Sequence, residues 1–283
     1  MKRSIGIILL STMAVAPVLT QAQSVLDGTY VKENVPARKV IPYTHLREAD
    51  VMWSRRVWRV IDLREKVNLP LYYPITPLKG KRSLMQTMYD GVVKDGTITA
   101  YDGGDDEFKK VITKAEILAQ LNRVDTFQME NPETGAIEQK IVPAEFDPGK
   151  VIQVRVKEEW FFDKQKSVLE CRILGLCPVM NDYATDGSIR GQKPIFWIYY
   201  PEARYVFANQ EVYNRQNDAE RRTLEDIIWK RQFGSYVYKV SNVFATESDS
   251  RRIADTKTGL DALLEAEKVK QEIFEKEHDL WEF

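Results

Sequence analysis

Few residues of this chain belong to the types that carry out catalysis or hold metals. Its 283 residues include two histidines, His45 and His278, and two cysteines, Cys171 and Cys177. A structural zinc site needs four Cys or His ligands, and general acid–base catalysis relies most often on histidine. The sequence therefore predicts no catalytic residue, no cofactor-binding residue and no metal ligand, and we expect a protein that is not an enzyme.

Two acidic segments have residue types that could carry chemistry. The segment YDGGDDEF at residues 101–108 is similar to the GGDEF hairpin of diguanylate cyclases but has one aspartate too many, and such an insertion turns the following side chains to the other face of a hairpin. Its carboxylates could hold a hard cation, but their spacing matches no EF-hand, so a solvated turn is expected. Glu158 and Glu159 are neighbours that would point to opposite faces of a strand, so they cannot act together on one glycosidic bond.

The N-terminus has the features of an export signal. Lys2 and Arg3 precede an apolar run that ends at Thr20-Gln21-Ala22, where small residues occupy the positions that signal peptidase reads. We expect residues 1–22 to be a cleaved Sec signal peptide, with an uncleaved membrane anchor as the alternative. In an oxidising compartment Cys171 and Cys177 are predicted to form a disulfide, with two buried free thiols as the alternative.

The elements after the signal begin with an extended arm and a helix. Residues 23–43 contain Pro36 and Pro42 and are predicted to be extended. Residues 44–68 are predicted to form a helix that Thr44 caps and that ends before Pro70. Its buried stripe would comprise Leu46, Ala49, Trp53, Val57 and Val60.

A second apolar spot on this predicted helix lies opposite the buried stripe. Val51 and Trp58 fall there beside Arg55, and they either meet another part of the fold or mark a surface for a partner. Arg55, Arg56 and Arg59 could pair with acids. We expect Val51, Arg55, Trp58 and the more distant Pro36 and Trp281 to be the candidate partner contacts.

The rest of the chain alternates helices and hairpins. Helices are predicted near 83–93, over 113–121 and from Thr223, the last two with a capping box; strands are predicted at 97–101 and 235–240. Residues 152–162 and 169–173 form one predicted hairpin, and 194–200 with 204–207 a second. Residues 125–150 are expected to be mostly loop and a possible subdomain boundary.

These patterns define the fold class and the domain organisation. Hairpins with segregated helices indicate an α+β fold with an antiparallel sheet, an extended N-terminal arm and a long C-terminal helix. The body would span residues 44–250, and residues 251–283 would be a charged helical tail with Leu260, Leu264, Phe274 and Trp281 near one face. The 41 basic and 42 acidic residues leave no excess positive charge for a nucleic acid, which is therefore not an expected partner.

Five segments of the chain resemble one protein family. The run YTHLREADVMWSRRVWRVIDLREKVNLPLYYP from Tyr43 is similar to the N-terminal region of the N proteins of gliding motility and Por secretion (GldN/PorN), which belong to the type IX secretion system of Bacteroidetes. The supporting segments are SLMQTMYDGV from Ser83, VRVKEEWFFDK from Val154, CRILGLCP from Cys171 and FGSYVYKVSNV from Phe233. The resemblance runs from about residue 30 to residue 242.

The resemblance implies a non-enzymatic periplasmic subunit at the inner face of the outer membrane. Such a subunit would form a ring with other copies and with an outer-membrane lipoprotein, the K subunit, and would contact the periplasmic region of the inner-membrane M motor protein. The alternatives are an exported enzyme acting on glycan or peptidoglycan, and a carbohydrate-binding module that uses the aromatic strand Phe196–Tyr200. No cofactor is expected.

Overall fold

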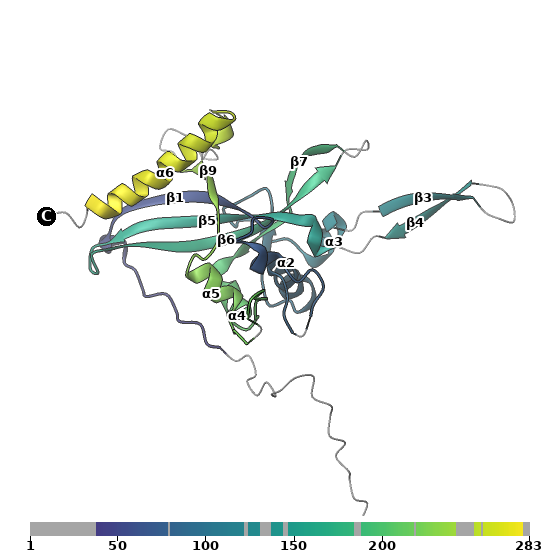
Figure 1. Ribbon diagram of the computed structural model, residues 1–283, viewed down its shortest axis with the longest axis horizontal. Coiled ribbons are helices and arrows are strands. Elements are labelled where there is room, and N and C mark those ends of the chain that lie inside the picture. Colours follow the sequence, from purple (N-terminus) through teal and green to yellow (C-terminus); the bar gives the residue numbers. More distant parts are fainter. Residues whose placement is uncertain are drawn as a thin grey trace, which may run out of the picture. The chain divides into compact units, whose positions relative to one another are not determined.

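One antiparallel sheet organises the described part of the chain. The computed structural model describes residues 38–78, 80–121, 124–130, 137–143, 147–183, 188–217, 219–241, 252–255 and 257–279. The sheet has seven strands in the order β2-β8-β6-β5-β1-β9, and β7 pairs with the free part of β6 (Figure 1). The strands are β1 (Val51–Asp62), β2 (Ala100–Asp102), β5 (Val151–Asp163), β6 (Val168–Tyr183), β7 (Ile189–Pro194), β8 (Phe196–Tyr199) and β9 (Tyr236–Val240).

Helices and short turns fill the connections between the strands. The helices are α1 (Leu69–Tyr72), α2 (Leu84–Tyr89), α3 (Lys114–Leu121), α4 (Tyr200–Ala208), α5 (Leu224–Trp229) and α6 (Leu260–Asp279). Shorter turns are η1 (Glu48–Asp50), the π-helical η2 (Asp90–Lys94), η3 (Pro148–Lys150) and η4 (Ile253–Asp255). An antiparallel sheet with separate helices confirms the α+β prediction.

The central hairpin is the one that the alternating pattern predicts. β5 and β6 pair from Asp163↔Val168 at the turn to Val151↔Met180. The register shifts twice, between Val151 and Gln153 and between Lys157 and Glu158; Lys157 pairs with Gly175, and Glu158 with Ile173. Leu174 is the extra residue of the bulge between Lys157 and Glu158. The odd-numbered side chains of β6 before Leu174 therefore point to one face of the sheet, and those after it point to the other face.

The prediction of a helix over residues 44–68 is wrong. Residues Val51–Asp62 form strand β1, which lies between β5 and β9 and pairs with β5 along nearly its whole length. β-Branched and tryptophan residues favour a strand, and a strand in the middle of a sheet can be apolar on both faces. The two apolar sides that we assigned to a helix are therefore the two faces of a central strand.

The capped helices are where the sequence predicts them. The Ser83 hydroxyl accepts a hydrogen bond from the Gln86 backbone N–H at the start of α2. Thr113 and Glu116 form the predicted reciprocal hydrogen bonds at α3, and Thr223 and Asp226 form a full capping box at α5. These short side-chain patterns predict helix starts well because they act within one turn.

Two further predictions are corrected. Residues 204–207, predicted to be the second strand of the aromatic hairpin, lie in helix α4. Pro201 lies in the first turn of this helix, where proline is favoured. The region expected to be mostly loop contains a two-stranded ribbon of β3 (Val124–Glu130) and β4 (Ile137–Pro143). In the described residues, no helix is both long and apolar enough to cross a membrane.

Three clusters of buried side chains hold the sheet and helices together. The largest joins residues of β1, β5, β6 and β8 to α2, α4 and α5. A second cluster packs Ala266, Val269 and Ile273 of α6 against Val57, Leu169 and Val237 of the sheet. A third contains Trp58, Cys177 and Trp197, with Phe108 and Tyr238 packed against it.

Candidate partner-binding surface

The arm that precedes β1 is bound to the body of the protein. The Arg38 guanidinium lies 2.6 Å from the Asp226 carboxylate, and the Arg38 backbone N–H donates to the Asn209 side chain. Burial alone would raise the pKa of Asp226, but hydrogen bonds from Thr223 and the charge of Arg38 outweigh it and lower that pKa. The prediction of an extended arm therefore holds for its described end, where it lies on α4 and α5.

Tyr43 is the main anchor of this arm. Its ring lies 5.3 Å from the Trp229 ring, and the guanidiniums of Arg204 and Arg172 approach it at 4.4 and 5.0 Å. Burial raises the pKa of Tyr43 to about 12, although the two arginines act in the opposite direction. Arg204 is itself nearly fully buried and pairs with Glu225 at 2.8 Å. Cation–π and ring–ring contacts of Tyr43 therefore hold the described part of the arm on the body.

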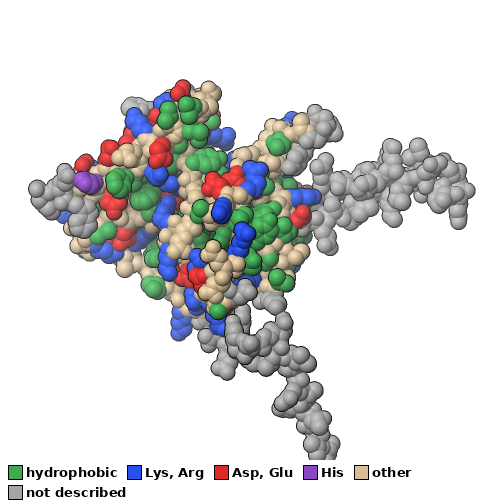
Figure 2. Space-filling view, in the orientation of Figure 1, with side chains coloured by type: hydrophobic (Ala, Val, Ile, Leu, Met, Phe, Trp, Pro, Cys, Tyr) green, Lys and Arg blue, Asp and Glu red, His purple; other side chains and the backbone are tan. Residues whose placement is uncertain are grey.

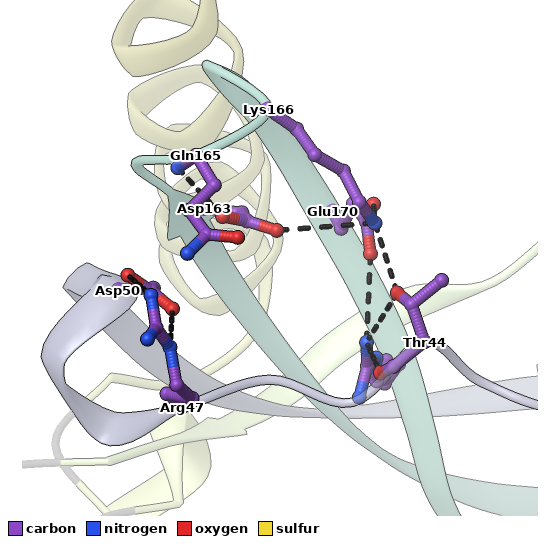
Figure 3. A network of polar contacts seen from close by, with 8 residues as sticks. Thr44, Arg47, Asp50, Asp163, Gln165, Lys166 and Glu170 are labelled. Carbon is purple, nitrogen blue, oxygen red and sulfur yellow. Dashed lines mark hydrogen bonds and ion pairs between the residues drawn. The ribbon is translucent and has the colours of Figure 1, made fainter.

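A polar network fixes the arm to the turn between β5 and β6. Figure 3 shows the Lys166 ammonium between the Thr44 hydroxyl, at 2.9 Å, and the Glu170 carboxylate, at 2.7 Å. Asp163 accepts from the Gln165 backbone N–H, and Arg47 pairs with Asp50 just before β1. Thr44, predicted to cap a helix, instead joins the arm to this hairpin turn.

Glu158 and Arg231 form a buried ion pair between β5 and the end of α5. The Glu158 side chain is fully buried, and the Arg231 guanidinium lies 3.0 Å from it. The Trp160 indole N–H also donates to the Glu158 carboxylate. Glu159, its neighbour in sequence, pairs instead with Arg56 on the opposite face. The two glutamates therefore do not converge on one site, as the alternation of side chains along a strand predicts.

Trp58 does not form a surface for a partner. Only 4% of it is exposed, because it packs with Cys177 and Trp197 on the face of the sheet away from α6. The ammonium groups of Lys157 and Lys239 lie over its ring at 5.6 and 4.5 Å. The second apolar spot of the predicted helix thus meets another part of the fold.

The other predicted contacts are placed as follows. Val51 is half-buried and pairs with Asp163 of β5. Arg55 forms an ion pair with Glu272 of α6 at 2.8 Å, so it holds the helix against β1. Pro36 and Trp281 lie outside the described residues.

The predicted disulfide is not formed in the structure. Cys171 and Cys177 are both free thiols on the single strand β6. Six residues of strand span about 20 Å, whereas a disulfide needs Cα atoms within about 7 Å. The bulge at Leu174 also places them on opposite faces, so Cys171 contacts Arg231 while Cys177 lies beside Trp58. Burial, and then the nearby Glu158 charge, raise the pKa of the Cys171 thiol.

The acidic turn at residues 101–108 holds lysines of the sheet. The Asp106 carboxylate pairs with Lys239 at 2.8 Å, and its backbone carbonyl accepts from the buried Lys157 ammonium. Burial lowers the pKa of Lys157. Phe108 anchors the turn by packing on Gly175, where an added Cβ would lie 2.5 Å from its ring. Among the described residues, no group of three or more His, Cys, Asp or Glu side chains could hold a metal ion.

The aromatic strand considered for sugar binding faces the core. Phe196, Trp197 and Tyr200 are all at least 98% buried. A carbohydrate-binding strand needs exposed rings on which a sugar can stack. This strand therefore cannot supply the binding platform of the carbohydrate-binding alternative.

A groove lies between α6 and the sheet. It consists of two adjoining cavities of about 290 and 380 Å³, which share Arg59, Glu267 and Lys270 as lining residues. Leu263, Leu264 and Phe274 of α6 line its rim, and each of these side chains is 59% exposed. Figure 2 shows hydrophobic side chains on the visible face of α6. Exposed apolar side chains gathered beside a groove are typical of a protein–protein contact.

Arg59 is a buried cation in the wall of this groove. It is 7% exposed, and within the described part of the chain its hydrogen bonds go to Ser235, to the hydroxyl at 2.9 Å and to the carbonyl. Burial lowers the pKa of Arg59, and the charge of Glu158 offsets this only in part. Arg55 and Arg56 pair with acids as the sequence suggests, whereas Arg59 has no carboxylate among its hydrogen-bond partners there.

Sequence reasoning missed this groove for two reasons. The helical interpretation of residues 44–68 treated Arg59 as an arginine that could pair with acids, although a strand interpretation would have put it on the same face as Val57. The apolar side chains of α6 were expected near one face, but Ala266, Val269 and Ile273 form a separate, buried stripe. Their spacing of three and four residues was the signal that could have revealed two apolar faces.

A protein-family model matches most of the chain. The family model described as "Gliding motility associated protein GldN" matches residues 46–282, from just before β1 to beyond the end of α6. No curated protein matches the chain.

Proposed function

This chain belongs to the GldN family of gliding-motility-associated proteins, and on that premise we propose that it is a non-enzymatic structural subunit that assembles into a ring. As a member of the family it is a component of gliding motility and type IX secretion. The proposed site of action is the periplasm, at the inner face of the outer membrane, after removal of residues 1–22. The proposed partners are the outer-membrane lipoprotein K subunit, further copies of the chain, and the periplasmic region of the M motor protein.

The observation that best supports a structural role is the unpaired apolar rim of α6. Leu263, Leu264 and Phe274 are each 59% exposed on a helix whose other face is packed on the sheet. Exposing a group of large apolar side chains to water is unfavourable in free energy, and a partner that covers the group removes this cost. A ring subunit must offer two different surfaces to its two neighbours, and this rim supplies one of them.

The arm supports a second contact. Its described end is fixed to α4 and α5 of the body through Arg38 and Tyr43. We propose that residues 23–37, including Pro36, contact the lipoprotein. A firm anchor reduces the ordering cost that an arm otherwise meets on binding.

The proposed function is tested by isolating the protein from its native envelope. A tagged copy is purified from detergent-solubilised envelopes, and the material is analysed by size-exclusion chromatography and mass spectrometry. A megadalton-scale assembly that contains an outer-membrane lipoprotein is the expected result. A lone monomer, under conditions that keep other envelope complexes intact, would contradict the proposal.

A truncation separates the arm from the body in the same assay. Deleting residues 23–37 leaves Arg38 and Tyr43 in place, so the melting temperature should stay within the error of the measurement. Recovery of the lipoprotein should fall, because its proposed contact is lost. The matched comparison is Tyr43→Ala, which keeps residues 23–37 but removes their anchor. This variant should lower both the recovery of the lipoprotein and the melting temperature. Undiminished lipoprotein recovery after the deletion would exclude residues 23–37 as the contact.

A further inference from the structure

The α6 groove, defined by Arg59, Trp160, Arg231, Leu263, Lys270 and Phe274, has the chemistry of a site for an acidic and aromatic peptide. Trp160 and Phe274 offer aromatic surface, and Leu263 adds an aliphatic rim. Positive charge comes from Arg59, Arg231 and Lys270 in its walls. Such a combination favours a segment in which carboxylates alternate with large apolar side chains.

The groove has two acidic side chains of its own, Glu267 and Glu277, and its three cations differ in their partners. Arg231 pairs with Glu158 beneath it, and Lys270 pairs with Glu267 at 2.9 Å. Arg59 is the cation whose hydrogen bonds within the described residues reach only Ser235. A buried guanidinium with neutral partners gains most from an incoming carboxylate, because charge-assisted hydrogen bonds are the strongest that it can form.

The end of the chain has the complementary sequence. α6 ends at Asp279 in the described residues, and four more residues follow: Leu280, Trp281, Glu282 and Phe283. Three of them are large and apolar, and the carboxylates of Asp279 and Glu282 lie on either side of Leu280 and Trp281 in the sequence. Trp281 is the residue that the sequence alone already marks as a candidate contact.

We propose that the α6 groove binds the C-terminal residues Leu280–Phe283 of a second copy of the chain. The segment from Leu260 to Phe283 contains no glycine or proline, the residues that most often end a helix and reverse the chain. Its sequence therefore favours a tail that continues away from its own groove. The contact joins the tail of one copy to the groove of the next, a head-to-tail arrangement that closes into a ring when the rotation between copies allows it.

This inference rests on the proposed role as a self-associating subunit, and it gives that self-association a site. The test uses the mature chain, residues 23–283, and a labelled peptide of residues 275–283, with binding followed by fluorescence anisotropy. The peptide should bind the unmodified chain and the Trp281→Ala chain equally, within a factor of two, at dilute protein. Binding should weaken with rising salt, because carboxylates meet Arg59 and Lys270.

Two groove variants make the assignment specific. Phe274→Glu places a charge on the rim of the groove and should weaken peptide binding at least tenfold. Leu260→Glu is the matched control, since Leu260 is 71% exposed on the same helix but does not line the groove. It should leave binding within a factor of two. Both positions are exposed, so the circular dichroism and melting temperature of the two variants should match the unmodified chain.

Three results would overturn the inference. The first is no peptide binding to either chain at about 1 mM peptide. The second is equal loss of binding in Phe274→Glu and Leu260→Glu. The third is binding at least tenfold tighter to Trp281→Ala than to the unmodified chain, which would mean that each tail occupies its own groove.

The two proposals fail separately. A chain that purifies with the lipoprotein in a large assembly but does not bind the peptide loses the groove assignment alone. A lone monomer recovered from intact envelopes overturns the ring role, whatever the peptide assay gives.

Discussion

Replacing Arg231 with methionine should destabilise the fold far more than the loss of a surface ion pair. Arg231 lies 3.0 Å from the fully buried carboxylate of Glu158. Methionine keeps an unbranched aliphatic side chain at this place. It also keeps a non-glycine residue where the backbone φ is +52°, so relief of backbone strain does not mask the effect. The variant leaves a carboxylate inside the protein without its ion-pair partner.

The magnitude follows from the burial of the pair. Removing one partner of a buried ion pair costs about 3–5 kcal/mol in the free energy of unfolding. Arg59 stays in the variant and interacts electrostatically with Glu158, so the lower end, about 3 kcal/mol, is expected. In a domain of this size, 1 kcal/mol corresponds to about 2–4 °C, so the melting temperature should fall by roughly 6–12 °C.

Urea unfolding at pH 7 measures the effect, and the neighbouring ion pair supplies the control. Arg56 and Glu159 lie 3.4 Å apart with side chains 54% and 29% exposed, so Arg56→Met should cost about 0–1 kcal/mol. Adding Glu158→Gln to Arg231→Met should recover part of the lost stability, because the buried charge is then removed. Equal losses for Arg231→Met and Arg56→Met would refute this reasoning.

Three further predictions test the packing, the arm and the cysteines. Gly175→Ala should lower the free energy of unfolding by about 1–3 kcal/mol, because the added methyl group would lie 2.5 Å from a phenylalanine ring carbon. The control is Gly191→Ala, which has open space around it and should change the free energy of unfolding in urea by at most about 0.5 kcal/mol. Asp226→Asn should lower the free energy of unfolding above pH 5, because the pKa of Asp226 is lowered in the folded state and its charge therefore stabilises the fold. This stabilisation is lost as the pH falls below about 4, so the unfolding free energies of the variant and the unmodified chain should converge there. Alkylation of the unreduced, unfolded protein should label both Cys171 and Cys177; labelling of neither would show that a disulfide forms after all.

The parts of the fold that the sequence predicts correctly are those governed by local patterns. The capping residues Thr113 and Thr223 act within one helical turn, and the alternation of β5 and β6 reports a hairpin whose strands are adjacent in sequence. The helix α6 was predicted from a long charged sequence with Leu260, Leu264 and Phe274 near one face. None of these elements depends on a distant partner for its identity.

The elements that were predicted wrongly depend on distant partners. β1 is a strand because β5 and β9, about 100 and 180 residues further along the chain, pair with its two edges. Arg204–Phe207 has strand-like residues but is helical, because Ala203 and Phe207 of α4 pack into the main core. The disulfide prediction used the spacing of the cysteines but could not include the bulge at Leu174. In each case a long-range contact outweighs a local preference.

The energetics of the α6 groove explain why it would act in an assembly and not in an isolated pair. Fully burying a Leu or Phe side chain is worth about 1.5–3 kcal/mol, and Leu263, Leu264 and Phe274 have 59% of that burial left to gain, so together they contribute roughly 3–5 kcal/mol. Association of two free molecules costs an estimated 4–15 kcal/mol in lost freedom. A single tail in a single groove is therefore a weak contact. In the proposed ring, copies held together at a membrane by the lipoprotein would meet this cost only once, so contacts that are weak in solution would become stable.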